Sequence, residues 1–270
     1  LDTFLVSRVY AEAAQPKPTE STQPTEAVAT ETSYQDENIS ITLATYRIDN
    51  SEVYVADIQL SSPEYLKTAL ADGVYGKNIT EKTSVTAQAA GAILAINGDY
   101  YGVQESGYVL RNGVLYRDTA VSGKEDLVIF ADGSFRIIRE DATSAQALLE
   151  AGAQQILSFG PALVKGGAVS VSEGQEVSKA KSSNPRTAIG IVGENHYVFV
   201  VSDGRTSDSQ GLSLYELAEF MQSLGVTAAY NLDGGGSSTL YFNGQVVNQP
   251  TTNGKKIQER SVSDIVCVSY

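Results

Sequence analysis

The segment VTAAYNLDGGGSSTLYFNGQVVN (226–248) contains the pattern that decides the fold. Its apolar start predicts a strand. The three glycines interrupt that strand, because each glycine costs roughly 0.5–1 kcal/mol of chain entropy relative to alanine. A second strand then leads into Asn243-Gly244, the favoured two-residue turn of a hairpin. The pattern therefore predicts two strands joined by a loop of bare backbone directly beside Asp233.

The same signals recur along the chain. Segments 39–48 and 53–60 are rich in β-branched residues and predict strands, and 107–116 and 126–138 predict hairpins with Asn-Gly and Asp-Gly turns. Helical spacing with caps or glycine stops predicts helices at 80–91, 143–152 and 213–225, and a proline start predicts another at 63–71. The strict strand–helix alternation of a doubly wound sheet is missing. We therefore expect an α+β fold: a mixed, largely antiparallel β-sheet core with several hairpins and three or four flanking helices.

The composition is that of a globular chain with an acidic surface. Of the 270 residues, 42% are hydrophobic, and the formal net charge is −13. Such a surface repels polyanions, so no nucleic-acid partner is expected, although a few focused arginines can still bind a small anion. The single histidine, His196, excludes a His-rich metal site and most Ser-His catalysis. The single cysteine, Cys267, lies in an apolar run typical of a buried strand.

The first 38 residues differ in composition from the rest. Residues 15–38 are rich in Pro, Thr and Glu, which is typical of an extended solvated linker. We expect residues 1–38 to be a stalk that follows a removed signal or membrane anchor, and 39–270 to be a single catalytic domain. The alternative is an ordinary disordered N-terminus. A stalk would place the domain outside a bacterial cell or on its surface, and only the missing anchor would contact the membrane.

Four polar turns follow or precede apolar strands, at 95–102, 182–190, 200–211 and 230–239. Loops at strand ends commonly carry binding sites. If these ends converge, they gather carboxylates, arginines and glycine backbone into a site for an anionic, sugar-like ligand: Asn97, Asp99, Arg186, Asp203, Arg205 and Asp233.

Two of these features have a structural alternative, and a third does not. Consecutive N–H groups of Gly234, Gly235 and Gly236 can bind an anion, but such a run also serves as a bulge or tight bend without a ligand. Arg186 can bind a phosphate with two charge-assisted hydrogen bonds, or form an ion pair with a nearby Asp. Asp203 precedes a long polar loop, a context more typical of a site than the short hairpin turn at Asp132-Gly133.

At these motifs the chain resembles the phosphodiester glycosidase family. The matching stretches are AINGDYYG (95–102), RTAIG (186–190), DGRTSDSQGLSLYELAEFMQSLG (203–225), NLDGGGSSTLYFNG (231–244) and RSVSDIVCV (260–268). They occur in the family's order over residues 90–270. The resemblance implies hydrolysis of the bond between a sugar anomeric carbon and a phosphate ester, which releases a free sugar and a phosphomonoester.

The resemblance also implies residue roles. The catalytic carboxylates would be Asp233 and Asp203, one of them acting as nucleophile or base at the anomeric carbon. The phosphate would be bound by Arg186 and Arg260. The other matching positions, expected to line the substrate site, are Asn97, Gly98, Gly234, Gly235, Gly236 and Ser237. A phosphate ester leaves as a stable anion, so a strong general acid matters less than in other glycosidases.

Asp99 departs from the small residue that is commoner at its position in the family, so the resemblance implies no catalytic role for it. Two alternative functions are also open. Asp99, Asp203 and Asp233 can supply oxygen ligands to a divalent cation, as in a metal-dependent phosphodiesterase that cleaves the P–O bond. The other alternative is a non-catalytic module that binds an anionic surface or cell-wall glycan. No cofactor follows from the sequence beyond that divalent cation.

Overall fold

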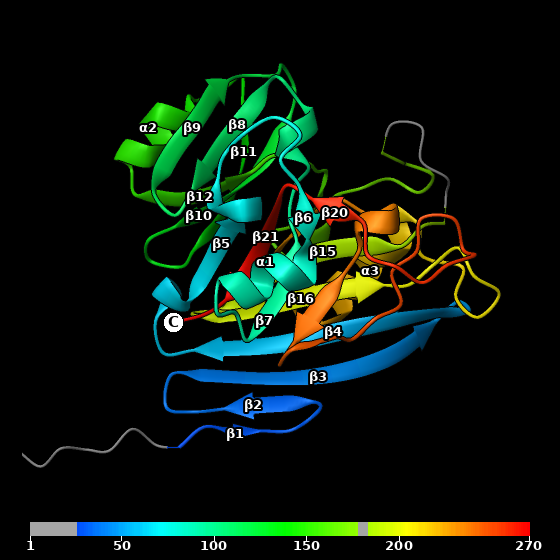
Figure 1. The fold of residues 1–270 in the computed structure, drawn as a ribbon. Helices are drawn as coiled ribbons and strands as arrows, with labels where there is room; N and C mark the ends of the chain where they lie inside the picture. Colours follow the sequence, from blue (N-terminus) through cyan, green and yellow to red (C-terminus); the bar gives the residue numbers. More distant parts are fainter. Residues whose placement is uncertain (1–25, 178–182) are drawn as a thin grey trace, which may run out of the picture.

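Four β-sheets form the framework of the described residues, 26–177 and 183–270, in the computed structural model (Figure 1). Every strand pair in these sheets is antiparallel. The predicted α+β class, with a largely antiparallel core and several hairpins, is confirmed. No helix in this part of the chain is long and apolar enough to cross a membrane.

The nine-stranded sheet, called the large sheet below, is the base of the molecule. Its order is β1 (Val28–Ala29), β2 (Ser33–Gln35), β3 (Ile39–Ile48), β4 (Ser51–Leu60), β16 (His196–Ser202), β15 (Arg186–Gly193), β17 (Ala228–Asn231), β13 (Ala162–Lys165) and β14 (Ala168–Val169). The strands predicted at 39–48 and 53–60 are confirmed as β3 and β4.

Two five-stranded sheets share a hydrophobic core with the large sheet. The middle sheet has the order β19 (Gln245–Val246), β18 (Leu240–Phe242), β7 (Leu94–Asn97), β21 (Asp264–Val268) and β5 (Leu66–Leu70). The hairpin sheet has the order β11 (Phe135–Arg139), β10 (Glu125–Phe130), β12 (Ala153–Leu157), β8 (Gly107–Arg111) and β9 (Val114–Thr119). A two-stranded ribbon pairs β20 (Ser261–Val262) with β6 (Glu81–Lys82).

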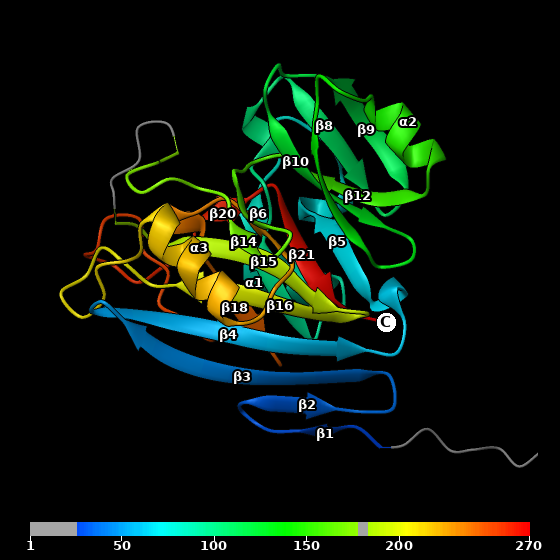
Figure 2. The same cartoon turned by 180° about the vertical axis from the view of Figure 1, so that it is seen from behind.

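Three α-helices lie in the described chain, and each confirms a predicted one. They are α1 (Thr83–Ala89), α2 (Ala145–Glu150) and α3 (Leu214–Ser223). Figure 2 shows α3 lying across the large sheet, and α2 beside the hairpin sheet. Four short 3₁₀ turns complete the elements: η1 (Pro63–Tyr65), η2 (Ala71–Gly73), η3 (Tyr101–Val103) and η4 (Gly235–Ser237).

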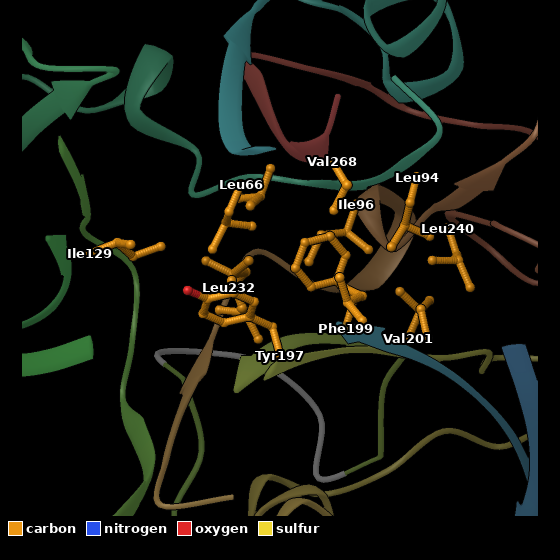
Figure 3. Packing of buried hydrophobic residues seen from close by; sticks show 14 of the residues in the cluster. Leu66, Leu94, Ile96, Ile129, Tyr197, Phe199, Val201, Leu232, Leu240 and Val268 are labelled. Atoms are coloured by element: carbon orange, nitrogen blue, oxygen red, sulfur yellow. The ribbon is translucent and has the colours of Figure 1, made fainter. Parts of the chain in front are cut away.

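The core has two layers because the large sheet is apolar on both faces. Side chains alternate across a strand, so neighbouring residues of β16 enter different clusters. Phe199 and Val201 pack toward the middle sheet with Leu94 and Leu240 (Figure 3), whereas Val198 and Val200 pack under α3. The continuous apolar run of β16 is thus explained by burial on both sides.

Two expectations about boundaries differ from the structure. The helix predicted at 63–71 is wrong: η1 ends at Tyr65 and β5 follows, because Leu66–Leu70 pairs along its whole length with β21. Residues 26–38, assigned to the stalk, include β1 and β2, and β2 pairs with β3 at the edge of the large sheet. Residues 1–25 of the expected stalk lie outside the described chain.

A buried ion-pair cluster joins the hairpin sheet to the rest of the molecule. Arg111, at the end of β8, forms ion pairs of 2.8 Å with both Asp99 and Asp264, and all three side chains are at most 2% exposed. Asp264 begins β21, and Asp99 follows β7. Burial raises the pKa of Asp264 to about 6, against the charge of Arg111. Removing the cation therefore leaves two buried carboxyl groups without a counter-charge.

We predict that Arg111→Met lowers the free energy of unfolding by about 3–5 kcal/mol, because it strands these carboxylates in the interior. Asp264, whose pKa burial already raises to about 6, would then bind its proton more tightly in the folded than in the unfolded state, so stability should fall as pH rises from 5 to 8. Urea denaturation at the two pH values measures this. The control is Arg139→Met, which removes an exposed pair with Asp141 and should cost under about 1 kcal/mol. Equal losses in the two variants would contradict the prediction.

Candidate active site

The predicted turns converge at one edge of the large sheet because its strands are antiparallel. Arg186 at the start of β15 is opposite Ser202 at the end of β16, and Ala188 is opposite Asn231 at the end of β17. The beginning of one strand and the ends of its two neighbours therefore lie together. The turns that follow β16 and β17 carry Asp203 and Asp233, so the antiparallel register explains why distant polar segments meet.

The Asn97 side chain connects this edge to the middle sheet. It is fully buried at the end of β7, and its Nδ2 donates a 2.6 Å hydrogen bond to the Asp233 carbonyl. Its Oδ1 accepts hydrogen bonds from the Thr187 hydroxyl (2.9 Å) and the Thr239 amide (3.2 Å). The adjacent Gly98 carbonyl also accepts a hydrogen bond from the Asp233 amide, at 3.2 Å. Through these contacts with Asp233, Asn97 and Gly98 position the glycine loop, residues 234–236.

A polar cavity of about 200 Å³ opens where these turns meet. It is lined by Phe159, Val177, Asn184, Arg186, Arg205, Asn231, Leu232, Asp233, Gly234, Gly235 and Arg260. Three other cavities are larger, at about 370, 440 and 540 Å³, and none of them is lined by a residue from the four polar turns. Volume alone therefore does not identify the site; the concentration of charged side chains does.

Three arginines line this cavity. Arg186 is 4% exposed; its Nη2 forms a 2.6 Å ion pair with Glu176, and its Nε donates to the Leu212 carbonyl. The predicted alternative of a structural ion pair is therefore present, with a glutamate in place of an aspartate. Burial lowers the pKa of Arg205, and so do the charges of Arg260 and Arg186. This mutual repulsion makes the cavity favourable for an anion.

The glycines are required because the arginines lie directly against their backbone. Gly235 has a φ of +62°, and a Cβ atom there would lie 2.8 Å from Nη2 of Arg205. A Cβ at Gly236 would lie 2.7 Å from Nη2 of Arg260 and 2.4 Å from the Thr252 hydroxyl. Thr252 also joins the two arginines, because its carbonyl accepts a 2.6 Å hydrogen bond from Arg205 Nη1. The guanidinium groups of Arg205 and Arg260 fit at these positions because Gly235 and Gly236 have no side chains.

The N–H groups of the glycine run are only partly available to a ligand. Gly235 N–H donates a 2.9 Å hydrogen bond to the Pro185 carbonyl. A Cβ at Gly234 would lie 2.8 Å from that same carbonyl. Three successive amides were expected to bind the anion, but the Gly235 amide already donates its hydrogen bond within the protein.

Asp233 is the carboxylate of this cavity, and burial changes its acidity. It is mostly buried and lines the cavity. Burial raises its pKa to about 6, although Ser237, the Arg260 charge and the Gly234 amide favour the charged form. A carboxyl group with this pKa is largely ionised at neutral pH and exchanges protons readily. Asp233 is the only carboxylate that lines this cavity within the described residues.

Two buried polar atoms beside Asp233 have no hydrogen-bond partner in the described chain. They are Oδ1 of Asn231 and Oγ of Ser237. The Ser237 hydroxyl lowers the pKa of Asp233 without making a hydrogen bond of normal geometry. Asn231 lines the cavity, and its Nδ2 donates to the Gly160 carbonyl at 2.9 Å. Unpaired buried polar groups are rare, and a polyhydroxylated ligand can satisfy such groups.

Asp203 lies near this cavity but not in its lining. Its carboxylate accepts hydrogen bonds from Asn248 Nδ2 (2.9 Å) and from the Gln249 amide (3.0 Å). Burial raises the pKa of Asp203, against these two hydrogen bonds and one from Tyr54. Asp203 thus anchors the start of the loop 249–260, which leads to Arg260. In this structure the contact of Asp203 with the Gln249 amide therefore positions the loop 249–260.

The three candidate metal ligands are not gathered together. Asp99 is paired with Arg111, and one of its oxygens also accepts the Ser158 amide at 2.9 Å. Within residues 26–177 and 183–270, no group of three His, Cys, Asp or Glu side chains is arranged to hold a metal ion. Instead, Asp99 pairs with Arg111, Asp203 accepts hydrogen bonds from Asn248 and Gln249, and Asp233 lines the cavity.

Some residues of the site were not among the predicted ligands. Arg205 was placed at the convergence of the turns, but no phosphate-binding role was assigned to it. Asn231 opens the glycine motif, and its signal was a polar residue that ends an apolar strand. Thr252 and Asn184 carry no recognisable pattern, because only the folded chain brings them against Arg205.

Comparison with known proteins shows the family to which the chain is related. The family model described as phosphodiester glycosidase matches residues 90–269. The chain is 32% identical over 206 residues to human N-acetylglucosamine-1-phosphodiester alpha-N-acetylglucosaminidase; this covers 68% of the chain and 39% of that protein. It is 30% identical over 177 residues to the SPbeta prophage-derived uncharacterized protein YomE of Bacillus subtilis, covering 64% of the chain and 26% of that protein. The chain thus spans less than two-fifths of these relatives' length.

The fold is also similar to that of solved structures. The catalytic domain of the zebrafish N-acetylglucosamine-1-phosphodiester alpha-N-acetylglucosaminidase superposes with a TM-score of 0.69 at 23% identity, covering 86% of this chain and 83% of that one. A hypothetical protein from Synechocystis superposes with a TM-score of 0.59 at 18% identity, covering 86% and 62%. With the family model matching two-thirds of its residues, and the glycine motif and arginines inside that match, the chain belongs to the phosphodiester glycosidase family.

Proposed function

We propose that this protein hydrolyses a sugar-1-phosphodiester at the glycosidic C–O bond, releasing a free sugar and a phosphomonoester. The observation that carries the proposal is one carboxylate, Asp233, in the same small cavity as Arg186, Arg205 and Arg260. This combination suits a substrate that is part sugar and part phosphate. Family membership supports the same reaction class.

In the proposed reaction, Arg205 and Arg260 bind the phosphodiester oxygens. Their positive charges stabilise the phosphate ester as the anomeric C–O bond breaks and the electron pair moves to the leaving oxygen. Asp233 lies at the anomeric carbon, where a carboxylate stabilises the oxocarbenium-like centre and assists the arrival of water. The water oxygen becomes the new hydroxyl of the sugar, and its proton is released. Asn231, which lines the cavity and whose Oδ1 has no partner in the described chain, is available for a sugar hydroxyl group.

A single carboxylate in the lining is consistent with this leaving group. Most glycosidases use two carboxyl groups, one of which protonates an alkoxide leaving group. A phosphate ester departs as a stable anion and does not need that proton. N-acetylglucosamine, the sugar in the name of the mammalian relatives, is the first sugar to test. The proposal includes an extracellular or cell-surface glycan conjugate as substrate, an expectation that rests on the Pro/Thr/Glu-rich composition of residues 15–25.

The position of bond cleavage distinguishes this reaction from a phosphodiesterase. Turnover in ¹⁸O-labelled water should place the label in the sugar and leave the phosphomonoester unlabelled, as mass spectrometry of the products would show. Label in the phosphate would mean P–O cleavage and overturn the proposal. Binding of the diester without any turnover would favour the alternative of a glycan-binding module.

Asp233→Asn should lower kcat by at least about 10³-fold, because the amide neither carries the charge nor accepts a proton. For the wild type, kcat/KM should fall as pH decreases below about 6, since protonation of Asp233 removes the active carboxylate. A pH–rate profile measures this, and the thermal midpoint shows whether the variant is folded. Asp203→Asn is the matched control and should keep the inflection near pH 6, because Asp203 acts through the loop 249–260. Full activity of a folded Asp233→Asn enzyme would refute the assignment.

Two glycine variants test the contact with Arg205. Gly235→Ala and Gly244→Ala both place a side chain at positive φ, and each should cost on the order of 1 kcal/mol of stability. Only Gly235 has an arginine within 2.8 Å of the added Cβ, whereas nothing lies within 4 Å at Gly244. Gly235→Ala should therefore raise KM for the diester about tenfold by displacing the guanidinium. Gly244→Ala should leave KM unchanged, and identical kinetics in both would contradict the role of Arg205.

A further inference from the structure

A second cavity adjoins the candidate active site and shares Arg260 with it. It measures about 370 Å³ and is lined by Lys82, Thr252, Asn253, Lys256, Gln258, Glu259, Arg260 and Ser261. Lys82 belongs to β6 and pairs with Ser261 of β20, so the two-stranded ribbon places it beside the residue that follows Arg260. Arg260 therefore stands on the boundary between the two cavities.

The second cavity is positively charged in a protein whose net charge is −13. Lys82, Lys256 and Arg260 line it, and within the described residues none of the three forms an ion pair with a carboxylate. The one acid in the lining, Glu259, is already bound by α1: its carboxylate accepts hydrogen bonds from the Ser84 amide (2.9 Å) and hydroxyl (2.5 Å). Three cations against the single carboxylate of Glu259 leave a net positive field at this point.

The loop that forms this cavity is held in place by its own hydrogen bonds. The Thr251 hydroxyl donates to the Lys256 carbonyl at 2.7 Å and accepts from the Gly254 amide at 3.0 Å. The Gln258 amide donates to the Pro250 carbonyl at 2.7 Å. Lys256 and Arg260 are therefore presented by an ordered loop, so the positive charges have a defined position relative to the first cavity.

We propose that the second cavity is the subsite for the leaving group, and that the preferred substrate carries a second negative charge on its aglycone. This inference rests on the proposed function. With the sugar beside Asp233 and Asn231 and the phosphodiester between Arg205 and Arg260, the group esterified to the phosphate extends past Arg260 into the second cavity. There Lys82 and Lys256 bind an anionic group, such as the next phosphate of a glycan with repeating phosphodiesters.

Two substrates with the same sugar test this selectivity. One is the methyl diester of N-acetylglucosamine-1-phosphate, and the other joins the same sugar-1-phosphate to glycerol phosphate. The wild type should hydrolyse the second with a kcat/KM roughly fivefold higher or more, as expected for two exposed ion pairs. This preference should shrink between 50 mM and 500 mM salt, because both lysines are solvent-exposed.

The double variant Lys82→Gln, Lys256→Gln should lose the preference and keep the wild-type kcat/KM on the methyl diester. The control is Lys77→Gln, Lys165→Gln, which makes the same change in net charge at exposed lysines outside both cavities. The control should behave as the wild type on both substrates. Unchanged preference in the Lys82, Lys256 variant would overturn the inference, and so would an equal loss on both substrates.

A binding measurement separates this inference from the proposed function. Calorimetric titration with glycerol phosphate should show affinity that the Lys82, Lys256 variant weakens roughly fivefold and the control does not. If the wild type hydrolyses neither diester but shows this lysine-dependent binding, the proposed function fails and the anion subsite stands. If it hydrolyses the diesters but the variant binds glycerol phosphate as tightly as the wild type, the subsite fails alone.

Discussion

The hydrogen bonds of the Asn97 side chain are the constraint on which the candidate active site depends. This one buried amide contacts the Asp233 carbonyl, the Thr187 hydroxyl and the Thr239 amide. Thr187 belongs to the large sheet, Asp233 lies in the turn after its strand β17, and Thr239 leads into the middle sheet. Removing the Asn97 amide takes this partner away from the Asp233 carbonyl and the Thr239 amide, and a buried polar group left unpaired costs about 1–3 kcal/mol. The geometry of the glycine loop is therefore coupled to the packing of the two sheets.

The second constraint is electrostatic. An acidic protein keeps three arginines in one small cavity, and their mutual repulsion is relieved only in part by Glu176 on Arg186. Space for Arg205 and Arg260 exists because Gly235 and Gly236 have no side chains. The same burial that brings the arginines together raises the pKa of Asp233. A single glycine loop thus places one carboxylate beside a pair of arginines.

Much of the fold could be predicted because its signals are local. The Asn-Gly and Asp-Gly turns produced hairpins, and the capped segment at 213–225 formed α3. The segment 63–71 misled because its helical spacing is weaker than the pairing of β5 with β21, which is remote in sequence. The edge strands β1 and β2 were missed for a related reason: a polar segment gains its strand structure from pairing with β3.

For the site, the sequence by itself determined which turns carry polar residues and that a bare backbone follows Asp233. Only the tertiary structure decided how similar residues divide their roles. Asp99 pairs with Arg111, Asp203 holds the Gln249 amide, and Asp233 alone reaches the cavity. The physical reason is that the charge state and availability of a carboxylate depend on its partners and its burial. Those partners come from distant parts of the chain, and folding alone brings them into contact.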